Sequence, residues 1–226
     1  NSKKQFDVFA YFLRKITPPM PCAVIVTCLF YGAISGSAPA TVAAVGSMTI
    51  PILSNLGYDL TFSTAIVAVA GGLGVIIPPS IPFIMYGMAS GASVSDLFLA
   101  GIIPGLMIGA LLMLYAIYHC KRYGEDKEKI HAEVQMLHDK GLLKVLKESF
   151  FALLSPVIIL GCIYTGVASP TEAAVISVFY ALIISLFVYK SIKLRDIWPI
   201  LVEAIRTFTP ILFILAASTA FSRVLT

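Results

Sequence analysis

Long apolar stretches separated by clusters of charge dominate this chain, and they predict helices in a membrane. From residue 16 to residue 120 there is no Lys or Arg, and the only acids are Asp59 and Asp96. Unpaired backbone amides are costly in a bilayer, so such stretches are expected to be helical. Two clusters of glycine, serine and proline interrupt them, at residues 32–39 and 71–82. Irregular backbone at membrane depth is tolerated only where it is buried in protein or lines a cavity.

The first interruption predicts a re-entrant hairpin over residues 20–54. The apolar segment 20–34 would form a helix only about 22 Å long, which does not cross a hydrocarbon core of about 30 Å. A second short helix is expected from residue 40 to about residue 53, followed by a turn at 55–59. Two short helices that meet at a tip of small residues are typical of a hairpin that enters and leaves on one side of the membrane.

The second interruption predicts a broken helix. Residues 60–89 are long enough to cross, but glycines and prolines in their middle favour two half-helices around an unwound segment. The span 97–118 carries no charge, and its glycines every four residues predict close helix packing. Further spans are expected at 150–166, at 173–189 and from residue 200 onward. The fold class predicted is therefore an all-α integral membrane protein.

Charge places these elements relative to the membrane and divides the chain into four parts. Residues 1–18 form an interfacial or preceding helix, 19–118 half of a transport domain, 119–148 an amphipathic cytoplasmic arm, and 149–226 the scaffold spans that begin a second repeat. The positive-inside rule is satisfied if the hairpin returns to the cytoplasm, and a single full crossing by residues 20–53 would break it. Two full crossings would also satisfy it, but each half is too short. Because both ends look cut, we expect the sequence to be the interior of a longer membrane protein.

Composition supports a membrane class and excludes others. The chain is 58% hydrophobic and 12% charged, with a mean hydropathy of +0.92, whereas soluble domains carry about 25% charged residues. No basic run adjoins a soluble fold, so nucleic-acid binding is disfavoured. The four cysteines are scattered, which favours buried thiols over a disulfide or metal site. The three histidines lie at or in the charged loop 119–148 and are expected to be solvated.

The two interruptions carry the candidate chemistry. The hairpin tip offers the hydroxyls of Ser35, Ser37 and Thr41, and tandem prolines leave backbone carbonyls without an N–H partner in the segment 74–79. Neutral oxygen ligands of this kind suit Na⁺. Half-helix C-termini add negative potential toward a cation, and N-termini add positive potential toward an anion. The alternative is that these residues only kink spans and pack helices.

Four motifs occur in order and resemble one known family. They are ISGSAPATVAAVG at 34–46, LGVIIPPSIP at 73–82 followed by Tyr86-Gly87, DLFLAGIIPG at 96–105 and ASPTEAA at 168–174. Together they are similar to the large membrane (M) subunit of tripartite ATP-independent periplasmic (TRAP) transporters, of the dicarboxylate-carrier M type. The resemblance runs from about Phe9 to Thr226.

The resemblance implies a multi-pass permease subunit of the bacterial inner membrane. It implies Na⁺-coupled import of an organic acid anion, such as a dicarboxylate or a sialic acid, without ATP and without enzymatic activity. A periplasmic solute-binding protein would deliver the substrate, and a small four-helix membrane (Q) subunit would support the scaffold. Members of the family are built from inverted repeats and are thought to move by an elevator motion.

The resemblance also implies site residues. It maps a sodium site onto five positions: Ser35, Ser37, Gly74, Ile77 and Pro79. Weaker candidates for the path of the ion or substrate are Gly36, Thr41, Pro78 and Ser80. The second hairpin and second broken helix of the family do not appear after Pro199, so half of the site is expected beyond Thr226. The fragment alone is not expected to transport.

Alternatives are a carrier coupled to another ion such as H⁺, or a membrane scaffold subunit that does not transport. A proton relay would need buried carboxylates, and the apolar stretch has none apart from the two loop acids. An intramembrane enzyme is disfavoured because no cluster of His, Cys or Asp lies within the spans. Glu172 is a candidate functional residue as a charge in or near the membrane, but the favoured interpretation is that Pro170 and the capping-type Ser and Thr beside it simply start a helix. Glu203 and Arg206 are predicted to pair on one helical face, the alternative being that they contact the substrate.

Overall fold

The computed structural model describes residues 2–13, 18–123, 130 and 142–225, and every regular element in these ranges is a helix. This confirms the all-α fold class. The chain divides into two compact units, Asn1–Ala174 and Val175–Thr226. The four-part division predicted from the sequence stays a prediction, because most of the arm at 119–148 lies outside the described residues.

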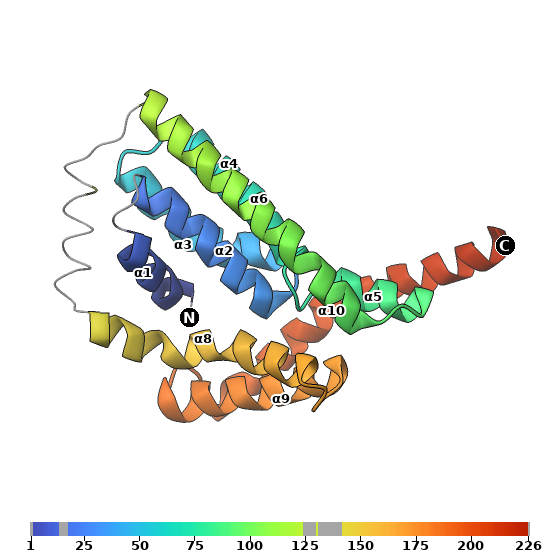
Figure 1. Cartoon of the computed structure of the whole chain (residues 1–226). Helices are drawn as coiled ribbons and strands as arrows, with labels where there is room; N and C mark the ends of the chain where they lie inside the picture. The colour runs from blue at the N-terminus through green and yellow to red at the C-terminus, as the bar shows by residue number, and fades with distance from the viewer. Residues whose placement is uncertain (1, 14–17, 124–129, 131–141, 226) are drawn as a thin grey trace. The chain divides into compact units, whose positions relative to one another are not determined.

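The first unit begins with three short helices (Figure 1). Helix α1 covers Ser2–Leu13, α2 covers Pro19–Ser35 and α3 covers Ala38–Asn55. Helix α2 is apolar on every side, and it contacts α1, α3, α4 and α6. A helix that is hydrophobic all round belongs inside a protein or a membrane, and here α2 lies at the centre of the unit.

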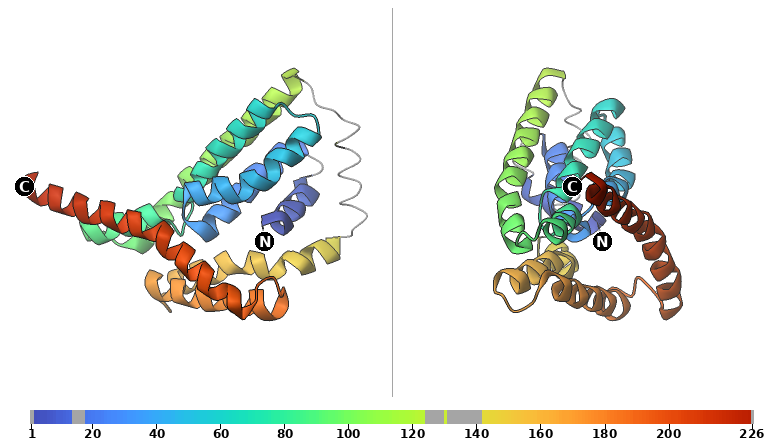
Figure 2. Two further views of the ribbon diagram at one scale, coloured as in Figure 1. Left: turned by 180° about the vertical axis from the view of Figure 1, so that it is seen from behind. Right: turned by 90° about the vertical axis from the view of Figure 1, so that its right-hand side faces the viewer.

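A broken helix and one long helix follow. Helix α4 (Leu60–Gly71) continues into a 3₁₀ turn, η1 (Gly72–Val75), and after a gap the chain resumes as α5 (Ile81–Ser90). Helix α6 (Val94–Tyr123) then runs back alongside α4, as Figures 1 and 2 show. A small residue also allows α3 to approach α4 closely: a Cβ on Gly46 of α3 would lie 3.0 Å from the Val67 side chain of α4.

Two groups of buried side chains hold the first unit together. The larger one joins α1, α2, α3, α4 and α6, with Met20, Ile25, Leu53 and Leu73 almost completely buried. The smaller one surrounds Phe98 and joins α6 to α8 (Leu142–Tyr164) and to the start of α9 (Pro170–Ile183). The broken helix is therefore buried against helices from both before and after it in the sequence.

At the start of α9, Glu172 and Ser169 form hydrogen bonds with each other. The backbone N–H and the hydroxyl of Ser169 both donate to Glu172 Oε2 at 2.8 Å, and the Glu172 N–H donates to Ser169 Oγ at 3.3 Å. This reciprocal arrangement is a capping box. It confirms the predicted helix start at Pro170 with a capping Ser beside it, and Glu172, whose side chain is exposed, completes the cap.

The second unit contains the rest of α9, a π-helical turn η2 (Ile184–Val188), a 3₁₀ turn η3 (Leu194–Asp196) and α10 (Ile197–Leu225). Large apolar side chains such as Phe187, Trp198 and Phe213 are exposed on it. Glu203 and Arg206 lie one turn apart on α10, and both are exposed. Their pairing stays a prediction.

Two helices among the described residues are long and apolar enough to cross a membrane, Val94–Tyr123 and Pro170–Val188. Only 22% and 11% of their most apolar windows are buried. A core helix of a soluble protein would be mostly buried, so these apolar exposed surfaces fit a lipid environment. Shorter apolar helices are Pro19–Ser35, Leu60–Val75 and Ile81–Ser90, the segments expected to form the hairpin and the broken helix.

Candidate functional site

The hairpin tip is a tight turn made possible by Gly36. This residue ends α2 in the left-handed conformation with φ 61°, and its N–H donates to the Gly32 carbonyl at 2.8 Å. Glycine adopts this conformation without strain. A Cβ on Gly36 would also lie 2.9 Å from the Pro79 carbonyl oxygen. Pro39 occupies the first turn of α3, a position where the missing N–H costs nothing.

The break between η1 and α5 is closed by Ser80. Its hydroxyl donates to the Val75 carbonyl at 2.7 Å and accepts the Phe83 N–H at 3.4 Å. Ser80 is completely buried and is the N-cap of α5. The hydroxyl therefore ties the end of one half-helix to the start of the next. Pro78 and Pro79, joined by a cis peptide bond, fill the gap between them.

The hairpin tip and the break lie directly against one another. The Ile81 N–H donates to the Gly36 carbonyl at 3.2 Å, which joins α5 to the tip. On the other side, a Cβ on Gly74 would lie 2.5 Å from Thr41 Oγ1 and 3.1 Å from the Ser37 carbonyl oxygen. A Cβ on Gly32 would lie 2.6 Å from Gly74 Cα. Only glycine permits this approach of two backbones.

A chain of hydroxyl contacts runs through the tip. Ser35 Oγ lies 2.8 Å from Thr41 Oγ1, and Thr41 Oγ1 donates to the Ser37 carbonyl at 2.8 Å. Ser35 Oγ also lies 3.2 Å from that carbonyl and accepts the Ser37 N–H at 3.3 Å. Ser37 thus takes part through its main chain in these contacts. Two hydroxyls and a carbonyl oxygen converge within hydrogen-bond distance of each other, with the backbone of Gly74 beside them.

Four helix ends meet at this place. The C-termini of α2 and η1 bring carbonyl groups, and the N-termini of α3 and α5 bring backbone N–H groups. Residues 16–58 and 60–95 contain no charged side chain, so the local potential comes from these backbone dipoles. Carbonyl and hydroxyl oxygens favour a cation, and the two N-termini favour an anionic group.

The structure brings most of the predicted residues together. Ser37 and Thr41 meet Gly74 on one side, with Ser35 bonded to Thr41, and Gly36 meets Pro79 on the other. The Ile77 side chain instead packs against Gly105 of α6, and its N–H donates to the Leu73 carbonyl at 2.9 Å. Pro78 is buried and borders a separate apolar pocket with Ile77. Ser80 is engaged in holding the break closed.

One residue at the site, Gly32, was not named as a candidate from the sequence, and another, Thr41, was ranked too low. Gly32 contacts the break through Gly74, and its spacing of four from Gly36 was the signal that could have found it. Thr41, taken only as a weaker candidate, is completely buried at the centre of the hydroxyl contacts. Its importance depends on the approach of Gly74, which no local pattern reveals.

Glycines on α6 allow the unwound segment between η1 and α5 to pack closely against this helix. A Cβ on Gly101 would lie 2.6 Å from the Ile76 carbonyl oxygen, and Gly105 contacts the Ile77 side chain. Farther along, a Cβ on Gly109 would lie 3.1 Å from Leu29 of α2. The close packing predicted for these three glycines is confirmed: Gly101 and Gly105 pack against the unwound segment, and Gly109 packs against α2.

One histidine differs from its expected solvated state. His119, near the end of α6, stacks on Phe62 of α4 with ring centroids 4.1 Å apart and an angle of 5° between the planes. His131 and His138 lie outside the described residues.

A sequence model of one family matches residues 3–226: the DctM component of the tripartite ATP-independent periplasmic transporters. Curated proteins are similar as well. The isethionate TRAP transporter permease protein DctMQ of Oleidesulfovibrio alaskensis is 44% identical over 225 residues, which make up 100% of this chain and 35% of that relative.

Two further relatives carry different substrate names. The C4-dicarboxylate TRAP transporter large permease protein DctM of Pseudomonas aeruginosa is 40% identical over 90% of this chain and 46% of its own length. The ectoine TRAP transporter large permease protein TeaC of Halomonas elongata is 35% identical over 96% of this chain and 49% of its own length. The chain therefore spans half or less of the relatives it matches.

Proposed function

This chain belongs to the DctM component family of tripartite ATP-independent periplasmic transporters, and we propose that the complete protein imports an organic acid anion together with Na⁺. The proposal concerns the complete protein, because the chain spans less than half the length of the relatives described above. The main support for the proposal is that the hairpin tip and the broken helix contact each other in a region without charged side chains.

The sodium ion would be held by neutral oxygens. The proposed ligand-bearing residues are Ser35, Ser37, Gly74, Ile77 and Pro79, and the weaker candidates Gly36 and Thr41 adjoin them. Hydroxyls of Ser35 and Thr41 and the Ser37 carbonyl already lie within hydrogen-bond distance of each other. Such a donor set fits a hard monovalent cation, and the C-terminal ends of two half-helices add negative potential there.

The substrate anion would bind near the N-termini of α3 and α5. Exposed N–H groups and the helix dipole at such ends favour negative charge. Relatives are named for isethionate, C4-dicarboxylate and ectoine, which differ in size and charge. A site made of backbone groups fits this range, and a separate binding protein would then select the substrate.

The remaining parts of the proposal follow the family. The protein would be a multi-pass subunit of the bacterial inner membrane. It would work with a periplasmic solute-binding protein and a small membrane (Q) subunit. No ATP would be used, since the gradient of Na⁺ supplies the energy. Coupling to H⁺ and a scaffold without transport are the two alternatives that the experiment must separate.

The experiment is uptake by the complete complex in liposomes across a series of Na⁺ concentrations. We expect Ser35→Ala to raise the half-saturating Na⁺ concentration about 10- to 100-fold, because a contact to a charge is worth about 1.5–3 kcal/mol. Ser37→Ala keeps the main-chain carbonyl and should change it less. Ser47→Ala is the matched control, since Ser47 lies exposed on the same hairpin and bonds only locally to the Ala44 carbonyl at 3.4 Å.

Three results would contradict the proposal in different ways. Uptake that follows a pH gradient and ignores Na⁺ would show coupling to H⁺. No uptake by the complete wild-type complex would favour the scaffold alternative. An unchanged Na⁺ dependence in Ser35→Ala would show that this hairpin hydroxyl only packs.

A further inference from the structure

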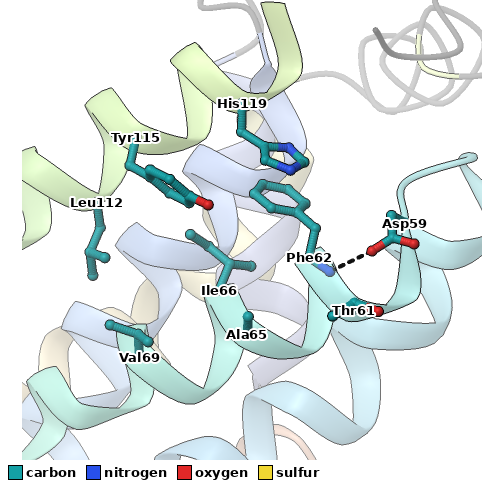
Figure 3. A pocket seen from close by; sticks show the side chains of 9 residues that line it. All are labelled: Asp59, Thr61, Phe62, Ala65, Ile66, Val69, Leu112, Tyr115 and His119. Carbon is teal, nitrogen blue, oxygen red and sulfur yellow. Dashed lines mark hydrogen bonds between the residues drawn. The ribbon is translucent and has the colours of Figure 1, made fainter. Parts of the chain in front are cut away.

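Another pocket lies between α4 and α6, separate from the hairpin tip and from the apolar pocket beside Pro78. It has a volume of about 420 Å³. Figure 3 shows its walls, with residues of α4 on one side and residues of α6 on the other. The lining residues that matter below are Asp59, Ile66, Val69, Leu112, Tyr115 and His119.

The two ends of this pocket differ in polarity. Ile66, Val69 and Leu112 line one end and are entirely apolar. Asp59, at the start of α4, and His119, near the end of α6, line the other end. Both elements are predicted to reach the cytoplasmic side at this end. The pocket therefore runs from an apolar interior toward a polar membrane surface.

Stacked rings form the wall at the polar end. His119 stacks on Phe62 with a centroid distance of 4.1 Å, and the Tyr123 ring is 4.7 Å from His119. Tyr115 lies 6.0 Å from His119 on the pocket side of α6. Aromatic rings with a polar edge are favoured at the membrane interface, and their faces attract an ammonium group.

Charges of both signs border these rings. Asp59 accepts the Phe62 N–H through Oδ2 at 2.8 Å, which caps α4, and its side chain is otherwise exposed. The Arg122 guanidinium lies 5.9 Å from the Tyr123 ring centroid and donates to the Tyr118 hydroxyl at 2.9 Å. The Asp59 carboxylate lines the pocket on the α4 side, and the Arg122 guanidinium lies beyond the lining residues, beside Tyr123 at the end of α6.

We propose that this pocket binds a phospholipid with an ammonium headgroup, of which phosphatidylethanolamine is the representative. One acyl chain would lie along Val69 and Leu112. The headgroup phosphate would face Arg122, because guanidinium matches phosphate. The ammonium group would face Asp59 and the aromatic rings. An anionic lipid without an ammonium group offers no partner to the Asp59 carboxylate.

The test uses the complete transporter, stripped of lipid and then supplied with phosphatidylethanolamine or phosphatidylglycerol, with retained lipid measured by native mass spectrometry. We expect the unmodified protein to retain phosphatidylethanolamine in preference to phosphatidylglycerol. Asp59→Asn keeps a capping oxygen and removes the charge. It should reduce the preference about fivefold, the factor expected of an exposed ion pair.

A second variant fills the apolar end. Val69 is 55% exposed, so Val69→Trp is expected to fold and to abolish retention of both lipids. Leu114→Trp is the matched control: Leu114 is 62% exposed on α6 but does not line the pocket. Thermal unfolding of each variant shows that it is intact.

Several outcomes would overturn the proposal. Equal retention of the two lipids by the unmodified protein would refute the headgroup assignment. Retention that survives Val69→Trp would show lipid bound elsewhere on the surface. No retention at all would show that another part of the full-length chain covers the pocket. None of these outcomes depends on whether the protein couples transport to Na⁺.

Discussion

Gly74 lies where no side chain fits, between the Thr41 hydroxyl and the Ser37 carbonyl. The contact ties the hairpin and the broken helix at a single backbone position. Because Thr41 is completely buried, the surrounding groups have little room to move aside. At the scale of single residues, the site is built from small groups that allow backbone oxygens to approach each other.

Gly74→Ala tests this close approach. The added methyl carbon would lie 2.5 Å from Thr41 Oγ1, so the hairpin and the break must separate. Since converging oxygens would lose their arrangement, we expect Na⁺ affinity in liposome uptake to fall about tenfold or more, the loss of one contact to a charge. Gly72→Ala is the control, because a Cβ there meets nothing within 4 Å. Equal behaviour of the two variants would contradict the proposed role.

Residue patterns in the sequence predicted part of this arrangement. Tandem prolines and glycines identified the break because they remove hydrogen-bond donors and helix propensity, which are local properties. The contacts of Thr41 with Gly74, and of His119 with Phe62, join residues more than thirty positions apart. Such contacts depend on how helices pack and could not be predicted from local pattern.

At the scale of elements, the main feature is that several helices end at the candidate site instead of continuing through the protein. The two helices of the hairpin end at the tip, and α4 with η1 and α5 end at the break, so four ends share one location. The predicted bounds of these helices were close because proline and glycine mark helix ends strongly. The Ser80 hydroxyl bridges the break. Gly101 and Gly105 of α6 pack against the same segment.

Replacing both Pro78 and Pro79 with alanine tests the break as an element. Alanine is the strongest helix former and restores two N–H donors, so the segment between η1 and α5 should become helical and withdraw its carbonyls. We expect uptake to be lost while the purified protein stays folded, as measured by thermal unfolding. Pro82→Ala should leave uptake intact, because Pro82 lies in the first turn of α5, where it opens no gap. Wild-type uptake by the double variant would exclude the break as a site.

The helices of the whole molecule must also fit the membrane. Helix α6 and the run Pro170–Val188 are long enough to cross it, whereas α2 and α3 are short. Basic side chains gather near the end of α6, at Lys121 and Arg122, and their side of the membrane follows from the positive-inside rule. Charge and length in the sequence thus constrain the topology, although neither fixes how the two units are arranged.

The topology yields the last prediction. If α2 and α3 form a re-entrant hairpin, the turn after α3 and the end of α6 lie in the cytoplasm, and the turn between α5 and α6 lies in the periplasm. Asn55→Cys and Lys121→Cys should then react with an impermeant maleimide only from the cytoplasmic side, and Ala92→Cys only from the periplasmic side. All three positions are exposed. Gly57 is avoided because its φ of 89° would strain a side chain.

The native cysteines provide a clean background for this experiment. Cys22, Cys28 and Cys120 are buried, and Cys162 is partly exposed, so Cys162→Ala removes the thiol most open to the reagent. A fully crossing segment in place of the hairpin would put Asn55 on the side opposite to residues 2–13. Labelling of Asn55→Cys from the periplasm would therefore refute the hairpin. Labelling of Ala92→Cys from the cytoplasm would refute the crossing of the broken helix, because a helix whose half-helices meet at midplane must place its two ends on opposite sides.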